Sequence, residues 1–283
     1  MSYRATIAKI SRQKGLAMLA FLKSELFFRF LGGFAIGAVA MFALQPNNEP
    51  PALTSTAIAS TATPGLFLLP LAALAAASSP LHAEPAVPAP IPALDAQPTR
   101  SLETAIFAGG CYWGVEGVFS HVKGVRLVVA GFAGGPRDRK VDYDMVSGGD
   151  TGFAESVRVT YDPKIVSYGT LLRIFFSVIT DPTTLNYQRP DSGTQYRSAL
   201  FPLNAEQDRA ARAYLAQLQK AGLWRDPIVT KVEPFTGFQD AGADHQDFMA
   251  RYPYHPYIQR WDMPKLKAFR AMYPTLYRSV PAA

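Results

Sequence analysis

The stretch Gly109-Gly110-Cys111-Tyr112-Trp113-Gly114-Val115-Glu116 constrains the fold of this chain more than any other. The residues before it, 103–108, form a short apolar run typical of a buried strand. The residues after it, through Val122, carry apolar side chains at helical spacing. Two consecutive glycines allow the backbone to turn sharply between these elements. The pattern therefore predicts a strand, a tight turn and a helix, with Cys111 at or near the helix N-terminus.

Cys111 is the only cysteine in the sequence, so neither an intramolecular disulfide nor a thiolate metal cluster can form. Unpaired N–H groups and the helix dipole favour an anion at a helix N-terminus. For a cysteine that anion is the thiolate, which is its nucleophilic form. A single cysteine is more often a small buried side chain without chemistry. The glycine turn before Cys111 and the aromatics Tyr112 and Trp113 after it favour a catalytic cysteine beside an apolar pocket.

The first hundred residues have the composition of a targeting and tethering sequence. A basic start precedes the uncharged run from Phe30 to Leu44, which is short for a bilayer-spanning helix of about 20 residues. A second apolar run, 65–77, is followed by Ser78-Ser79-Pro80-Leu81-His82-Ala83, a pattern typical of a secretory cleavage site. Residues 1–83 are therefore predicted to be a signal or membrane-anchoring segment, and two buried core helices are the alternative. The remainder of the chain is expected to be exported, periplasmic or membrane-anchored, outside the cytoplasm.

Residues 84–101 contain five prolines among alanines. This composition predicts an extended, semi-rigid linker that buries no core, followed by a single domain over residues 102–283. The net charge of +6 arises mainly from the first 30 residues, and the part after residue 100 is close to neutral. Because that part has no basic stripe, nucleic-acid binding is not expected.

Strand and helix patterns alternate along residues 102–283. The run 156–161 alternates polar and apolar side chains, which predicts a half-exposed strand. Further strands are predicted at 103–108, 125–132, 198–201 and 228–232, and helices after Cys111, at 168–178, from Asn204 to about Lys220, and at 263–272. This interleaving predicts one α/β or α+β domain.

A few polar residues stand out as candidates for chemistry. Glu155 lies at the start of a strand, where burial raises the pKa of a carboxyl and makes it a proton donor; a solvated glutamate is the alternative. The turn 191–197 delivers Tyr196 into a strand, or is a plain connecting loop, and Tyr143 has the ordinary interpretation of a surface aromatic. His245 is interpreted as a structural, hydrogen-bonding histidine. The four histidines show no metal-ligand spacing, so no metal site is expected.

Three motifs occur in a fixed order: Gly109–Glu116, then Gly152-Phe153-Ala154-Glu155-Ser156-Val157, then Asp191-Ser192-Gly193-Thr194-Gln195-Tyr196-Arg197. Together they resemble the peptide methionine sulfoxide reductases of the A type, over about Thr104 to about Tyr254. The resemblance implies an α/β (α+β), ferredoxin-like fold, a two-layer sandwich around a mixed sheet with βαβ units. It also implies a peptide-methionine (S)-S-oxide reductase. Such an enzyme reduces methionine S-sulfoxide in proteins, and as the free amino acid, and so repairs oxidative damage.

The same resemblance implies a role for each matching residue. Cys111 would attack the sulfoxide sulfur, and Glu155 would donate a proton to the sulfoxide oxygen. Tyr143 and Tyr196 match family tyrosines that hydrogen-bond this oxygen, and Asp191 matches an aspartate at the same site. The product on the enzyme would be a sulfenic acid at Cys111.

Tyr112 and Trp113 match a Phe-Trp pair that encloses the S-methyl group of the substrate, with tyrosine in place of phenylalanine. Two departures from the family stand out. Phe153 occupies a position that is usually histidine, and the chain lacks a resolving cysteine near its C-terminus. The sulfenic acid would therefore be reduced by an external thiol, whether a thioredoxin-like protein, a glutaredoxin-like protein or a small thiol.

No bound cofactor is implied, and the chain is expected to be a monomer. The departures from the family support one alternative function, a non-catalytic binder of oxidised or Met-containing peptides. The presence of Cys111 and Glu155 opposes that alternative. A cysteine hydrolase is a third reading, which fits poorly because no histidine stands at a recognisable base position.

Overall fold

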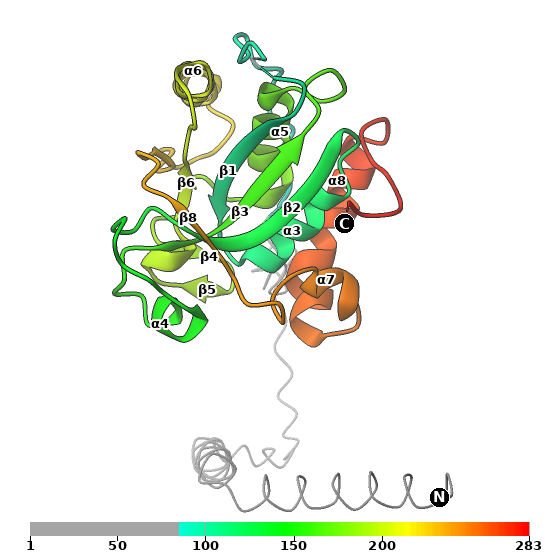
Figure 1. Cartoon of the computed structure of the whole chain (residues 1–283). Helices are drawn as coiled ribbons and strands as arrows, with labels where there is room; N and C mark the ends of the chain where they lie inside the picture. The colour runs from blue at the N-terminus through cyan, green and yellow to red at the C-terminus, as the bar shows by residue number, and fades with distance from the viewer. Residues whose placement is uncertain (1–84, 99, 283) are drawn as a thin grey trace, which may run out of the picture. The chain divides into compact units, whose positions relative to one another are not determined.

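The computed structural model describes residues 85–98 and 100–282 (Figure 1). The predicted signal or anchor segment, residues 1–83, lies outside this range. Within it, every helix is too short or too polar to cross a bilayer.

The centre of the domain is a six-stranded sheet with the order β7-β6-β1-β3-β2-β8. All neighbouring strands are antiparallel except β6 and β7, which are parallel, so the sheet is mixed. The strands are β1 (Glu103–Gly109), β2 (Val125–Ala133), β3 (Ala154–Tyr161), β6 (Ser198–Leu200), β7 (Lys231–Val232) and β8 (Phe238–Asp240). A separate short hairpin consists of β4 (Tyr187–Gln188) and β5 (Asp191–Ser192).

Helices connect and cover these strands. The α-helices are α3 (Tyr112–Ser120), α4 (Tyr143–Ser147), α5 (Tyr168–Ile174), α6 (Ala205–Ala221), α7 (Phe248–Arg251) and α8 (Met263–Met272). Two π-helical turns, Phe175–Ile179 and Ile258–Asp262, follow α5 and precede α8, and Thr194–Tyr196 is a 3₁₀ turn.

The central strands follow the ferredoxin-like order. Two βαβ units, β1–α3–β2 and β3–α5–β6, interlock so that the strands lie in the order β6-β1-β3-β2. The core lies between the sheet and the two crossover helices. There Phe107 of β1 packs against Phe119 of α3 at 4.9 Å and against Phe175, just after α5, at 5.4 Å between ring centroids. The predicted α/β (α+β) fold around a mixed sheet is confirmed.

Local signals located several elements correctly. The Asn204 side chain accepts a hydrogen bond from the Gln207 N–H and so caps α6, and Gly222 ends this helix with φ 60° in the left-handed region. Helix α8 has the predicted bounds. The alternation predicted for 156–161 holds over most of β3, where Val157, Val159 and Tyr161 are buried and Arg158 and Thr160 are partly exposed; the exception is Ser156, which is buried although it is polar.

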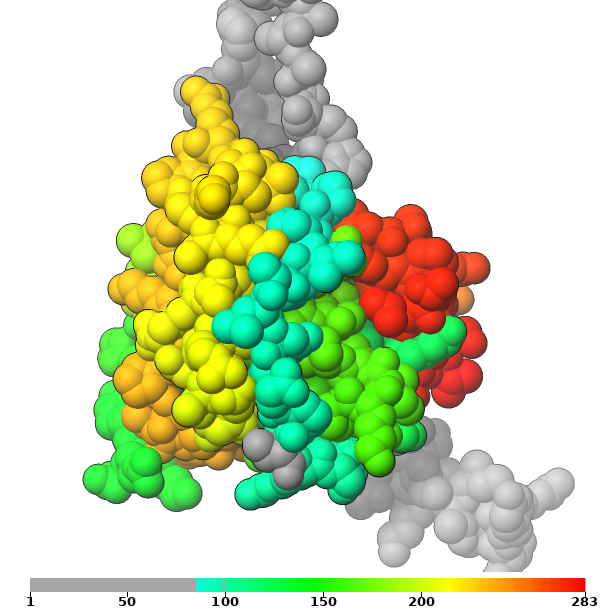
Figure 2. Space-filling view, turned by 90° about the horizontal axis from the view of Figure 1, so that it is seen from above, coloured from blue at the N-terminus to red at the C-terminus, as the bar shows by residue number. Residues whose placement is uncertain are grey.

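The proline-rich segment 85–98 packs on the domain. The N–H of Val87 donates to the Ser177 carbonyl at 2.8 Å, and that of Ala89 donates to the Ser177 Oγ at 3.1 Å. Ala89 is only 1% exposed, and the Tyr214 hydroxyl donates to the carbonyl of Pro90 at 2.7 Å. Figure 2 shows the segment in cyan beside α6 in yellow. The expectation of a linker that buries nothing is wrong here, because small alanines fit closely and the extended backbone offers its polar groups to the domain.

Candidate active site

Cys111 sits at the junction between β1 and α3, as the sequence predicts. It is the residue directly before the first turn of α3 and is 8% exposed. Gly110 has φ +95°, and a Cβ there would lie 2.6 Å from the Gln188 side chain, so this turn requires glycine. Gly110 therefore fixes the path of the backbone between β1 and α3, and with it the position of the Cys111 thiol.

The Cys111 thiol is protonated at neutral pH. Burial raises its pKa well above the usual value, and the carboxyls of Glu155, Asp262 and Asp191 raise it further. The backbone N–H of Trp113, in the first turn of α3, lowers this pKa as the sequence predicts, but burial of the sulfur and the neighbouring carboxyls raise it by more. The expectation of a thiolate is therefore wrong.

Glu155 is a buried carboxylic acid in the central strand β3, with 2% of its surface exposed. The backbone N–H of Tyr112 donates to its Oε2 at 2.9 Å, which joins the carboxyl to the first turn of α3. Burial raises the pKa of Glu155 to about 8, and Asp191 and Asp262 add to this effect. The expected rise of its pKa is confirmed, and at neutral pH the group carries a proton.

Tyr143, Tyr196 and Asp191 gather around these two residues. Tyr143 begins α4, Tyr196 ends the 3₁₀ turn, and Asp191 belongs to the β4–β5 hairpin. Burial and the nearby Glu155 raise the pKa of both phenols, so both remain hydrogen-bond donors across the physiological range. The structure thus brings together five residues that the sequence spreads over 86 positions.

Trp113 and Tyr112 occupy different places in the site. Trp113 is half-buried, with its ring stacked on Phe248 at 3.8 Å and edge-on to Tyr257 at 5.7 Å. Tyr112 is 0% exposed and packs against Phe132, with ring centroids 5.9 Å apart. Trp113 therefore keeps part of its apolar ring accessible, whereas Tyr112 is fully buried, with its ring centroid 6.5 Å from that of Trp113.

Two residues of the site were missed at the level of sequence. The Tyr257 hydroxyl donates to Asp191, and Asp262 is buried against Gly114 in the first turn of α3. Tyr257 directly precedes the π-helical turn Ile258–Asp262 and Asp262 is its last residue, and π-turns are frequent at functional sites. The cluster of aromatics from Tyr252 to Trp261 was the available signal for Tyr257. Asp262 looks like an ordinary helix cap before Met263.

Phe153 is buried and its ring packs against Gly135. The position that is usually histidine in the family therefore holds an apolar side chain that is 3% exposed. Among residues 85–98 and 100–282, no group of three or more His, Cys, Asp or Glu side chains could hold a metal ion.

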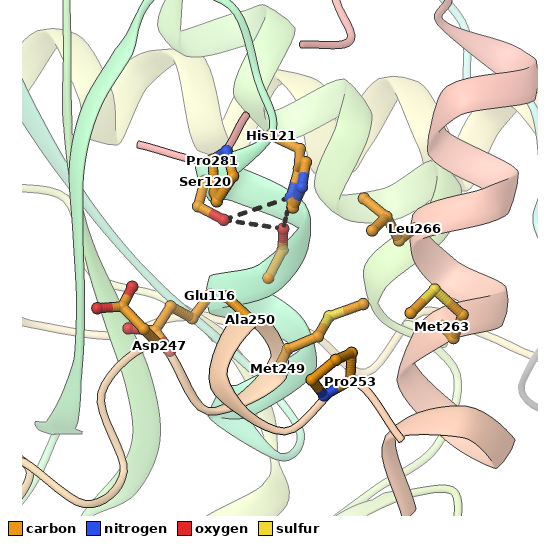
Figure 3. A pocket seen from close by; sticks show the side chains of 11 residues that line it. Glu116, Ser120, His121, Asp247, Met249, Ala250, Pro253, Met263, Leu266 and Pro281 are labelled. Atoms are coloured by element: carbon orange, nitrogen blue, oxygen red, sulfur yellow. Dashed lines mark hydrogen bonds between the residues drawn. The ribbon is translucent and has the colours of Figure 1, made fainter. Parts of the chain in front are cut away.

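A separate cavity of about 260 Å³ lies beside the later turns of α3 (Figure 3). It is lined by residues of α3, α7 and α8 and by the C-terminal segment, including His121, Met249, Met263 and Leu266. Glu116 borders it, and burial raises the pKa of this carboxyl to about 8. Cys111 does not line this cavity, which is distinct from the cluster around the thiol.

Comparison with known proteins identifies the family. The family model for peptide methionine sulfoxide reductase matches residues 103–275. The chain is 50% identical over 188 residues to peptide methionine sulfoxide reductase MsrA 2 of Mesorhizobium japonicum, covering 66% of this chain and 96% of that protein. For MsrA 2 of Synechocystis sp. the identity is 47%, with 65% and 87% covered. The reduced Mxr1 structure from Saccharomyces cerevisiae is 33% identical, with a TM-score of 0.49, and the match covers 58% of this chain and 92% of that one.

The fold and the buried cysteine–carboxyl site define a thiol oxidoreductase, and the chain belongs to the peptide methionine sulfoxide reductase family. It reduces methionine sulfoxide and so repairs oxidised proteins.

Proposed function

We propose that the protein reduces the S epimer of methionine sulfoxide in proteins and peptides, and in free methionine, with Cys111 as nucleophile and Glu155 as acid. The observation that carries this proposal is the shared position of the two groups at the first turn of α3. Cys111 precedes the turn, and Glu155 accepts a hydrogen bond from its first N–H. A protonated carboxyl beside a buried sulfur can act as a general acid that protonates the oxygen of a bound sulfoxide.

The chemistry balances without a cofactor. The Cys111 sulfur attacks the sulfoxide sulfur while Glu155 gives its proton to the sulfoxide oxygen. The protonated oxygen then leaves the methionine sulfur as hydroxide, and its attack on the Cys111 sulfur breaks the transient bond between the two sulfurs. The oxygen thus ends on Cys111 as a sulfenic acid, and the methionine sulfur leaves as a thioether, reduced by two electrons. The proton of the Cys111 thiol returns Glu155 to its acid form, so no net proton is consumed.

The surrounding residues orient the substrate in this scheme. The phenols of Tyr143 and Tyr196 donate hydrogen bonds to the sulfoxide oxygen, and their raised pKa values keep them protonated. Asp191 accepts a hydrogen bond from the Tyr257 hydroxyl, which fixes the side of the site formed by the β4–β5 hairpin. Trp113 contacts the S-methyl group with its exposed apolar surface, backed by Tyr112.

Regeneration requires an external thiol, because the chain has no second cysteine. A thiol attacks the Cys111 sulfenic acid, water leaves, and a mixed disulfide remains. A second thiol then frees Cys111. A dithiol protein of the thioredoxin-like or glutaredoxin-like kind supplies both thiols from one molecule, whereas a small thiol acts twice. The composition of residues 1–83 supports export of the domain from the cytoplasm, as a monomer tethered to the membrane or released from it.

The test uses separated S and R sulfoxide epimers of a methionine peptide, with dithiothreitol as reductant. Wild-type protein is expected to turn over the S epimer repeatedly and to leave the R epimer unchanged. Cys111→Ser is expected to be inactive, because a hydroxyl is a far weaker nucleophile at neutral pH. Turnover by the serine variant, or equal turnover of both epimers, would contradict the proposal.

A further inference from the structure

The loop between β8 and α7, residues 241–247, is fixed to the edge of the sheet. The N–H of Ala241 donates to the carbonyl of Ala130 in β2 at 2.9 Å. The side chain of Gln246 donates to the carbonyls of Ala130 and Ala241 and accepts from the Ala130 N–H, each at 2.9 Å. These bonds hold both ends of the loop, so the residue before Gln246 has a defined position.

That residue, His245, lies among the aromatic side chains of the site. Its ring centroid is 4.3 Å from that of Tyr143, with 32° between the planes. It is 5.9 Å from the Trp113 ring at 19°, and the Tyr112 ring meets it edge-on at 5.6 Å. The imidazole therefore connects the indole on the methyl side of the site to the phenol on the oxygen side.

A directional hydrogen bond adds to this packing. The indole Nε1–H of Trp113 can only donate, and its partner is Nδ1 of His245 at 3.3 Å. Nδ1 is therefore the unprotonated nitrogen, and Nε2 carries the proton toward the exposed Asp244 carboxylate at 3.5 Å. The ring of Phe248, 3.8 Å from Trp113, blocks rotation of the indole on another side.

We infer that His245 is a positioning residue for the sulfoxide site, which fixes the Trp113 indole and the Tyr143 phenol relative to each other. The inference rests on the proposed roles of these two residues. His245 acts through them and not on the reacting atoms. Because Trp113 and Tyr143 belong to separate helices, α3 and α4, their spacing is not set by either helix alone. An imidazole that accepts a hydrogen bond from the indole and packs at 32° against the phenol ring sets this spacing directly.

The inference predicts separable effects on catalysis. A loosened indole weakens the hold on the S-methyl group and raises KM, whereas a displaced phenol slows the chemical step and lowers kcat. A displacement of about 1 Å in such a site costs roughly 100-fold in rate, so we expect a loss of about 10- to 100-fold in kcat/KM.

Two substitutions in the full-length protein separate the contributions of the imidazole. His245→Phe keeps a stacked ring but removes the acceptor, and His245→Asn keeps an acceptor near the Nδ1 position but removes the ring. In His245→Phe we expect the indole N–H resonance of Trp113 to shift in a nitrogen-15 spectrum, while Trp224 and Trp261 serve as unchanged internal references. In His245→Asn we expect that resonance to stay near its wild-type position, with KM recovered and kcat still reduced.

A Trp113→Phe background completes the test. If the acceptor works through the indole, adding His245→Phe to Trp113→Phe should cost less than threefold more in kcat/KM. An equal loss with and without Trp113 would overturn the inference, and so would an unshifted indole resonance together with wild-type kinetics in His245→Phe.

Should His245→Phe fail to fold in a thermal melt, the separate effects of His245→Asn on kcat and on KM decide the question. Wild-type kcat and KM in that variant would refute the stacking role. An inactive wild-type protein would instead contradict the proposed function, while the indole resonance still reports on the hydrogen bond.

Discussion

Replacing Glu155 by glutamine removes the acid of the proposed mechanism and keeps the shape of the side chain. The amide can still accept the 2.9 Å hydrogen bond from Tyr112, so the first turn of α3 should remain in place. Loss of a positioned general acid lowers the rate of a chemical step by about 10²- to 10⁴-fold. We therefore expect single-turnover formation of the Cys111 sulfenic acid to slow by that factor in Glu155→Gln.

The pH profile gives a sharper test of the same residue. A pKa of about 8 means that the acid form predominates at pH 7 and is lost above pH 8. If Glu155 is the required acid, the single-turnover rate of the wild-type protein should be independent of pH below pH 7. Above pH 8 it should fall about tenfold per pH unit. In Glu155→Gln the inflection near pH 8 should disappear.

The raised pKa of Glu155 also couples folding to pH, with a defined sign. Its folded value of about 8 lies above its usual value of 4.5, so the folded state binds the proton more tightly than the unfolded state. The resulting stabilisation is present below pH 4.5 and is lost as pH rises from 4.5 through 8. At about 1.4 kcal/mol per pH unit, the full difference is on the order of 5 kcal/mol.

Urea unfolding at pH 5 and pH 9 measures this coupling. The free energy of unfolding of wild-type protein should fall more between these pH values than that of Glu155→Gln. Glu116, whose pKa burial also raises to about 8, contributes equally to both proteins and cancels in the comparison. Identical pH dependence of stability in the two proteins, together with an unchanged inflection in the rate, would refute the account of Glu155.

Two further perturbations test other parts of the structure. A chain that begins at residue 102 instead of 85 lacks the hydrogen bonds of segment 85–98 to Ser177 and Tyr214. Its free energy of unfolding, measured by urea titration, should be lower by about 2–4 kcal/mol. Equal stability of the two chains would show that the packed segment does not stabilise the domain. Asp262→Asn removes one carboxyl that raises the pKa of Cys111. It should speed alkylation of the thiol by iodoacetamide at pH 8 several-fold, and an unchanged alkylation profile would contradict that electrostatic role.

The sequence predicted the elements whose signals are local. Asn204 and Gly222 are a helix cap and a helix stop that act within one turn, so α6 could be placed from them alone. The raised pKa of Glu155 could be predicted because its apolar neighbours indicate a buried strand, and burial is what raises the pKa.

The errors arose where distant segments meet. The state of the Cys111 thiol depends on Asp191 and Asp262, 80 and 151 positions away, which reach the sulfur only in the folded chain. Tyr257 was missed for the same reason, since its partner Asp191 belongs to another element. Proline and alanine indicate extended backbone, so the composition of segment 85–98 predicts a linker. Composition does not tell whether an extended backbone finds a surface to pair with.

The protonated thiol of Cys111 has a consequence for selectivity among oxidants. A thiol reacts with peroxide mainly as thiolate, so a sulfur whose pKa lies well above neutrality is a poor scavenger. A sulfoxide differs from peroxide in carrying a basic oxygen that can take the Glu155 proton as the sulfur is attacked. A site in which both the Cys111 thiol and the Glu155 carboxyl are protonated should therefore react slowly with peroxide. Its thiol then stays available for the methionine sulfoxide that peroxide produces.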